Sequence, residues 1–155
     1  MTAPVVTGPQ KIAMTAPVLT NPDYMQFVLP VEFRTLQDVP VPEDPTVHIR
    51  EVPHRLIAVN RFSGAYSEEY FKSKLTELQQ RLVAEGLLPK ESEAQAMDWS
   101  FAQYNPPFCL PFLRRNEVWI NLSGMAQQVP RLQQLLDLTA KAQEQEKLTG
   151  ETKTS

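Results

Sequence analysis

The sequence predicts a single α+β domain that is built mainly from short antiparallel strands. Several segments alternate apolar and polar residues, as a half-buried strand does, whereas one segment near the middle repeats its apolar residues at helical spacing. Fourteen prolines interrupt the strand-like segments, which is typical of edge strands and bulges. With 155 residues, of which 42% are apolar, the chain is long enough to enclose one core.

A short repeat marks the start of the chain. The residues Met-Thr-Ala-Pro-Val begin at Met1 and occur again from Met14. Solenoids and propellers repeat with periods of about 20–50 residues and many copies, so a motif with two closely spaced copies does not indicate an array. We interpret the two copies as the strands of a hairpin that turns at residues 8–10. Because Pro4 and Pro17 lack a backbone donor, this hairpin is expected at the rim of a sheet.

The remaining strands follow from alternation and from β-branched residues. We expect strands at residues 24–34, 47–52, 56–62, 96–104 and 117–122. Three prolines make residues 39–45 a stiff connector with no helix. The loop at residues 105–113 is rich in proline and phenylalanine, and it is too apolar to be a neutral spacer.

Two helices are expected. The first begins at the N-cap Ser67, carries Glu68 and Glu69 in its first turn, and ends at Gly86. Its apolar residues follow alternating four- and three-residue steps: Phe71, Leu75, Leu78 and Leu82. The second is an amphipathic helix at residues 125–147, with Pro130 near its first turn and with Val129, Leu132, Leu135 or Leu136, and Thr139 on one side. Residues 148–155 form a polar tail.

Composition excludes several classes of function. The net charge of −3 and the scattered lysines and arginines provide no basic patch for nucleic acid. No apolar segment is long enough to span a membrane, and no targeting segment is visible. The single cysteine cannot form an internal disulfide, so a reducing compartment is the default. The nucleophile elbow, the phosphate-binding loop and the paired metal-ligand motifs of common enzymes are all missing from the sequence.

The loop and the residues that follow it are the candidate binding site. Phe108, Leu110 and Phe112, together with Met14, offer an apolar surface for a flat ligand such as a tetrapyrrole. The next residues, Arg114 and Arg115, offer two guanidinium groups for its carboxylates.

The plainer interpretation is an ion pair between one of these arginines and Glu117. We give the two interpretations equal weight, and each can hold for a different arginine. Cys109, His48 and Met14 are weak candidates for an iron ligand. A buried inert thiol, a surface histidine and an apolar lining are the simpler roles for these three.

Five segments carry a resemblance to a known family: 11–18, 25–30, 61–64, 104–108 and 114–120. In order and spacing they resemble the SOUL haem-binding protein family, and most of all its plant and algal members. The resemblance covers roughly residues 1–122. It implies a distorted antiparallel β-barrel of two pseudo-symmetric halves with flanking helices, related to the ligand domains of multidrug-sensing regulators. It also implies a cytoplasmic or chloroplast protein.

Relative to that family, residues 1–124 are expected to form a domain that lacks the first strand and helix. Two explanations are open: the chain is a fragment, or the helix at residues 125–147 covers the sheet face that the missing elements leave open. The resemblance implies non-covalent, reversible binding of haem or another tetrapyrrole by a carrier, buffer or sensor. Its contacts carry over to Lys11, Met14, Phe108, Leu110 and Arg114. Neither His48 nor His54 inherits the axial-ligand role that some members place upstream.

Two other classes of function stay open. One is an enzyme that acts on tetrapyrroles, for example by removing the metal, with Glu32, Glu117 or His48 as proton donor. The other is a protein-interaction module that docks one of its amphipathic helices into a partner. For either helix, packing on the chain's own sheet explains the apolar stripe equally well.

Overall fold

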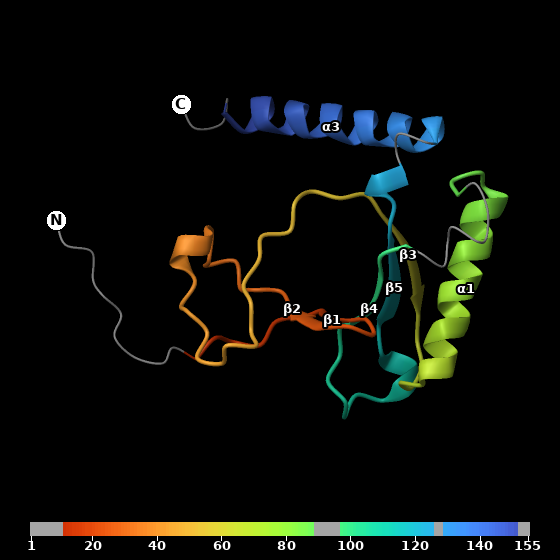
Figure 1. Cartoon of the computed structure of the whole chain (residues 1–155). Helices are drawn as coiled ribbons and strands as arrows, with labels where there is room; N and C mark the ends of the chain where they lie inside the picture. The colour runs from red at the N-terminus through yellow and green to blue at the C-terminus, as the bar shows by residue number, and fades with distance from the viewer. Residues whose placement is uncertain (1–10, 89–96, 126–128, 152–155) are drawn as a thin grey trace.

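A five-stranded antiparallel sheet and two long helices make up the protein, as a computed structural model shows for residues 11–88, 97–125 and 129–151 (Figure 1). The strands are β1 (Val18–Thr20), β2 (Met25–Phe27), β3 (Ile57–Phe62), β4 (Trp99–Gln103) and β5 (Asn116–Asn121). Their order across the sheet is β2-β1-β4-β5-β3. The α+β class is therefore confirmed. The described strands form an open sheet with β2 and β3 at its edges.

The helix α1 (Glu68–Ala84) is the element that the sequence predicts best. The Ser67 hydroxyl accepts a hydrogen bond from the backbone N–H of Tyr70 at 3.4 Å, which satisfies one of the free amides of the first turn. The helix ends where Gly86 takes a φ of +68°, a left-handed conformation that glycine adopts without strain.

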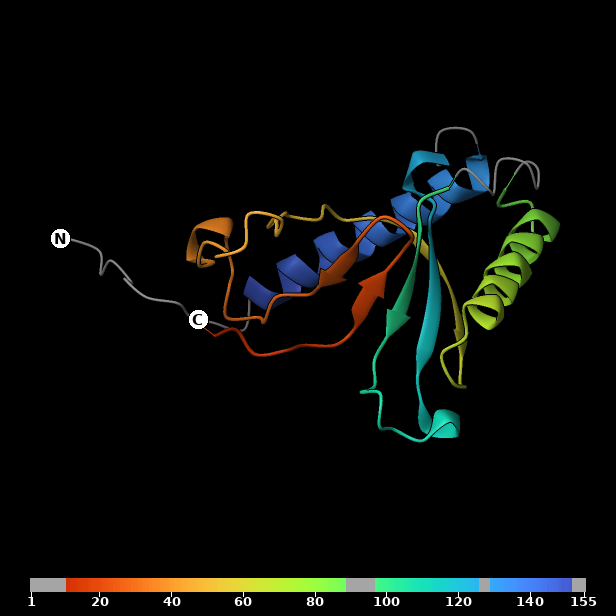
Figure 2. The same ribbon diagram turned by 60° about the horizontal axis from the view of Figure 1, so that its bottom comes forward.

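The core lies between α1 and one face of the sheet, as Figure 2 shows from the side. The four predicted helix positions are all buried: Phe71, Leu75, Leu78 and Leu82. They meet Phe101 of β4 and Val118 and Ile120 of β5, and the rings of Phe71 and Phe101 pack edge to face with centroids 4.8 Å apart. Burying each large apolar side chain contributes about 1.5–3 kcal/mol, so this cluster dominates the stability of the domain.

The last helix, α3 (Pro130–Glu151), lies across one end of the sheet in Figure 1. Its start joins the core through Val129, just before the helix, and Leu132, and Leu136 packs against the same cluster. Leu135 and Leu138 are 41% and 63% exposed. Among the helix side chains that the structure describes, those of the first turns enter the core. That the helix covers the open face of the sheet stays a prediction. None of the helices in the described part of the chain is long and apolar enough to cross a membrane.

The N-terminal half departs most from the sequence prediction. The first copy of the repeat lies outside the described residues. Of the second copy, only Val18 belongs to a strand, and β1 pairs with β2 on one side and with β4 on the other. The predicted hairpin needs the first copy and therefore lies outside the described residues, so it stays a prediction. The chain turns at Asn21, whose side-chain oxygen accepts hydrogen bonds from the amides of Asp23 and Tyr24.

Two strand predictions were wrong in extent: one strand is shorter than predicted, and the other does not form. The strand predicted at residues 24–34 is real only for Met25–Phe27, because a turn closed by Phe33 N–H donating to Pro30 C=O follows it. Residues 47–52 form no strand, although they alternate. Prolines at 45 and 53 keep this segment extended, but no neighbouring strand pairs with it. The predictions for 56–62, 96–104 and 117–122 were correct in type, with small differences at their ends.

Candidate functional site

An apolar loop connects β4 to β5. It spans residues 105–113, hereafter the apolar loop, and it ends in a short 3-10 turn, Pro111–Leu113. Four large apolar side chains of this loop are strongly exposed: Phe108 at 87%, Leu110 at 56%, Phe112 at 69% and Leu113 at 62%. Isolated exposed apolar residues are common on proteins, but four within six residues form a patch of the kind that marks a binding surface.

Hydrogen bonds hold the apolar loop in shape. The guanidinium group of Arg114 donates from Nε to the carbonyl oxygen of Cys109 at 2.8 Å, and from a second nitrogen to the carbonyl oxygen of Pro107. The Asn105 side chain accepts a bond from the backbone N–H of Arg115 at 2.6 Å. A bond from Gly64 N–H to Pro111 C=O at 3.0 Å ties the loop to the end of β3. The apolar side chains are thus presented on a braced backbone, which reduces the entropy lost when a ligand binds.

Behind the loop, a buried carboxylate organises the start of β5. The side chain of Glu117 is 5% exposed and accepts hydrogen bonds from Tyr104 Oη at 2.9 Å and from Trp119 Nε1 at 2.8 Å. Arg115 adds a bond from Nε at 2.8 Å, and its guanidinium carbon lies 4.1 Å from the centre of the Tyr104 ring. Glu117 and its register partner Ala102, which is fully buried, lie on the sheet face that points away from α1.

The contacts of Glu117 decide its charge. Burial on its own raises the pKa of this carboxyl, but the bonds from Trp119, Arg115 and Tyr104 outweigh burial and lower the pKa below its ordinary value. Burial, and then the bond to the carboxylate, raise the pKa of the Tyr104 phenol. Glu117 is therefore ionised at neutral pH and cannot act as the acid that delivers protons to a ring.

The two arginines have separate roles, as one of the sequence interpretations allowed. Arg115 pairs with Glu117, and Arg114 braces the loop through carbonyl groups. Each guanidinium group has already used part of its donor set inside the protein. Arg114 is partly exposed beside the apolar patch, so its remaining N–H groups are the ones nearest to a ligand on the loop.

The structure does not bring every predicted site residue to one place. Met14 is 80% exposed, and Lys11 is exposed as well. Figures 1 and 2 both show the segment that leads into β1 extending away from the apolar loop. Phe108, Leu110 and Phe112 do lie together with Arg114 and Arg115, at one end of β4 and β5.

The weak metal candidates come from three different segments. His48 is exposed on the extended chain before β3, Met14 precedes β1, and Cys109 is half-buried in the apolar loop, where its thiol lies 3.7 Å from the carbonyl oxygen of Leu110. Within the described ranges, no group of three or more His, Cys, Asp or Glu side chains could hold a metal ion. Glu32 is exposed and, like His48, lies on a segment separate from the apolar loop.

Comparison with known proteins gives one match. A family model described as SOUL heme-binding protein matches residues 5–121. The chain belongs to this family. No curated protein sequence and no solved structure matches the chain. The family match includes all five strands, α1, the apolar loop and the buried Glu117, and it ends before α3.

The apolar loop of this SOUL-family protein offers apolar contacts to a flat ligand, but it offers no clear ligand to a metal ion. The flat apolar face of such a ligand matches the exposed side chains of Phe108, Leu110 and Phe112, which are held on a braced loop. An iron ligand is harder to identify, because the thiol of Cys109 is only partly exposed and points along its own loop toward Leu110.

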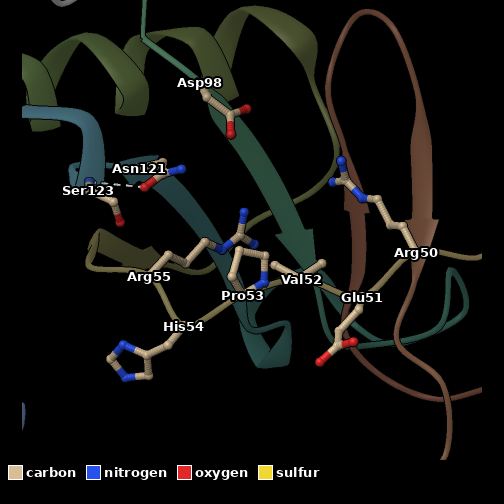
Figure 3. A pocket seen from close by; sticks show the side chains of 9 residues that line it. All are labelled: Arg50, Glu51, Val52, Pro53, His54, Arg55, Asp98, Asn121 and Ser123. Atoms are coloured by element: carbon tan, nitrogen blue, oxygen red, sulfur yellow. Dashed lines mark hydrogen bonds between the residues drawn. The ribbon is translucent and has the colours of Figure 1, made fainter. Parts of the chain in front are cut away.

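A pocket that the sequence analysis did not anticipate lies elsewhere. Residues 50–55 line one side of it, and Asp98, Asn121 and Ser123 line the other (Figure 3). It forms where the extended segment before β3 passes the ends of β4 and β5. A sequence signal existed, since Arg50 and Arg55 flank a prolyl turn. Only the fold shows that both face a common space.

Proposed function

We propose that this protein reversibly binds haem or a related tetrapyrrole on the apolar loop and acts as a carrier, buffer or sensor. The observation that supports the proposal most is the exposure of four large apolar side chains on one braced loop, in a chain that belongs to a haem-binding family. A ligand that covered this patch would remove its apolar surface from water, which contributes roughly 25 cal/mol per Å².

In this proposal the ring lies against Phe108, Leu110 and Phe112, and Arg114 donates its remaining N–H groups to a propionate. Arg115 contributes less, because Glu117 already holds it. Lys11 and Met14 lie in the separate segment that leads into β1, so they take part only if one ligand spans both segments. The bound ring, not the protein, supplies any redox or photochemical reactivity.

The test is a titration of the protein with ferric haem and with metal-free protoporphyrin, followed by the Soret absorbance. Because contact with the ring dominates, we expect comparable affinities for the two ligands. A double substitution, Phe108→Ala with Phe112→Ala, should weaken the binding of both about tenfold or more, since each truncation removes a large apolar contact.

Val41 provides a matched control, because it is 89% exposed and lies outside the apolar loop. The substitution Val41→Ala should leave both affinities unchanged. A clear preference for haem over protoporphyrin would contradict stacking without coordination. Equal loss in the double variant and in the control, or no binding of either ligand, would refute the proposal for the apolar loop.

We also propose the finer architecture of the family for this chain: a distorted barrel of two pseudo-symmetric halves, with residues 1–124 as the ligand domain, in the cytoplasm or the chloroplast. The match over residues 5–121 supports it. In a closed barrel the N–H groups on both sides of β2 and of β3 would be hydrogen-bonded to a neighbouring strand. In an open sheet the N–H groups on the outer side of each of these edge strands face water. Amide hydrogen exchange measures this difference. Fast exchange along one side of both strands would exclude closure.

A further inference from the structure

We propose that the pocket between Arg50 and Arg55 binds a small oxyanion, that is, a carboxylate or phosphate group. This site is separate from the apolar loop, and its argument does not depend on the proposed function. It rests on three features of the described chain: two guanidinium groups without a carboxylate partner, further hydrogen-bond donors between them, and a backbone that holds these groups in place.

The first feature is the position of the two arginines. In Figure 3 the side chains of Arg50 and Arg55 extend toward the same space, and Arg55 is partly buried. Neither forms an ion pair with any carboxylate of the described residues, although Lys72, Lys74, Arg81, Arg115 and Arg131 all do. Arg50 lies instead over the ring of Tyr24, with its guanidinium carbon 5.4 Å from the ring centre. The aromatic contact orients this cation and leaves its N–H groups for a ligand.

The second feature is the supply of neutral donors. The Asn121 side-chain oxygen accepts a bond from Ser123 N–H at 3.1 Å, so the amide nitrogen points the other way, toward the pocket in Figure 3. The Ser123 hydroxyl oxygen accepts a bond from Leu56 N–H at 2.9 Å, which leaves its own proton free to be donated. An oxyanion has several lone pairs, and it is the kind of group that can accept bonds from all of these donors at once.

The third feature is the rigidity of the walls. The backbone of Leu56 is bonded on both sides: its N–H donates to Ser123, and its C=O accepts from Leu122 N–H at 2.9 Å. On the opposite wall, Asn121 N–H donates to Asp98 C=O at 2.9 Å. These bonds fix Arg55 and Asn121 relative to each other, so little ordering is needed when an anion binds.

The charges of the pocket give the proposal its sharpest test. In Figure 3 the carboxylate of Asp98 points into the space that the two arginines share, whereas the Glu51 carboxylate and the His54 ring point away. The inward-facing groups are thus two cations and one anion. Asp98 repels a bound oxyanion, whereas Arg55 attracts it. Removing one charge or the other should therefore change the affinity in opposite directions.

Inorganic phosphate is the probe, added to the full chain at constant ionic strength with chloride as the balancing salt. Binding is followed by two-dimensional NMR of the arginine Nε–Hε groups. We expect two of these signals to shift with a common saturation curve. Arg55→Gln should weaken phosphate binding about tenfold, as expected for the loss of a charge-assisted bond. Asp98→Asn should strengthen it about twofold to fivefold, as expected for an exposed charge.

The matched control is Arg34→Gln, which removes an exposed arginine outside the pocket and should leave phosphate binding unchanged. Thermal unfolding of each variant confirms that it is folded. No saturable shift, the same affinity in Arg55→Gln as in Arg34→Gln, or weaker binding in Asp98→Asn would each overturn the proposal.

The source of the oxyanion is decided by a second titration, with metal-free protoporphyrin. If Arg55→Gln weakens both phosphate and protoporphyrin, the pocket receives a propionate of the ring. If it weakens phosphate alone, the pocket takes a separate small anion. Both results support an oxyanion site. Failure of the apolar loop to bind protoporphyrin would leave the phosphate result intact, so the two proposals fail independently.

Discussion

Replacing Glu117 by glutamine is the most direct test of the buried carboxylate behind the apolar loop. In the native protein Oε1 accepts from Arg115, and Oε2 accepts from Tyr104 and Trp119. A glutamine amide keeps one acceptor and turns the other into a donor. In either orientation, at least one existing donor therefore meets an N–H group.

The expected cost follows from those contacts. Hydrogen bonds to a charged group contribute about 1.5–3 kcal/mol each, and removing one member of a buried ion pair costs about 3–5 kcal/mol. The Arg115 side chain is 45% exposed, so it can turn toward water and recover part of its hydration. We therefore expect Glu117→Gln to lower the free energy of unfolding by about 2–3 kcal/mol.

The assay is urea unfolding followed by circular dichroism, with Glu32→Gln as the control. Glu32 is exposed, and its substitution should change the free energy of unfolding by less than about 0.5 kcal/mol. In a domain of this size, a loss of 2–3 kcal/mol corresponds to a melting temperature lower by about 4–12 °C. A loss in Glu117→Gln that is no larger than in the control would refute the reasoning about the carboxylate.

The pH dependence gives a second signature. The folded-state pKa of Glu117 lies below its ordinary value of 4.5, so the unfolded chain takes up the proton first as the pH falls. The stabilisation is therefore complete above about pH 4.5 and is lost as the pH falls through the folded-state pKa. The difference in unfolding free energy between the native protein and Glu117→Gln should shrink over that acidic range. A difference that stayed constant with pH would contradict the assignment.

Three further substitutions test the fold, and each is measured by urea unfolding. Leu132→Ala should cost about 2–5 kcal/mol because it empties a fully buried site, whereas Leu138→Ala at a 63% exposed site should cost less than 1 kcal/mol. Gly86→Ala should cost about 1 kcal/mol because its φ of +68° is unfavourable for alanine, and no clash adds to this cost because a Cβ there meets no atom within 4 Å. Gly124→Ala should cost less, because a Cβ there also meets no atom and its φ lies outside the left-handed region. Ser67→Ala should cost about 1 kcal/mol by removing the cap of α1. Equal effects within either matched pair, or an unchanged stability in Ser67→Ala, would contradict these assignments.

The core of the fold could be predicted from the sequence because its signals are local. Ser67, the helical spacing of four apolar residues and Gly86 all act within α1 itself. The strands β3, β4 and β5 carry enough β-branched and aromatic residues to be recognised singly. In contrast, residues 47–52 alternate like a strand, and only the absence of a paired neighbour in the folded sheet makes them a connector.

The candidate site was predictable in part. Its apolar loop stands out in the sequence as a cluster of prolines and phenylalanines between two strands. The separate roles of Arg114 and Arg115 could not be read from two adjacent identical residues, because one turns toward loop carbonyls and the other toward Glu117. The pocket at Arg55 depends on Asn121 and Ser123, which lie far away in sequence and arrive there through the pairing of β3 with β5.

The long helix α3 has a consequence for how the molecule moves in solution. Its 22 residues extend about 33 Å, and the core contacts that the structure describes for it lie in its first turns, where Leu132 is buried. A compact protein of 155 residues has a radius of gyration of about 15 Å. A straight element of this length is longer than twice that radius, so it raises the radius and makes rotational diffusion anisotropic. The protein should therefore tumble more slowly than a sphere of its mass.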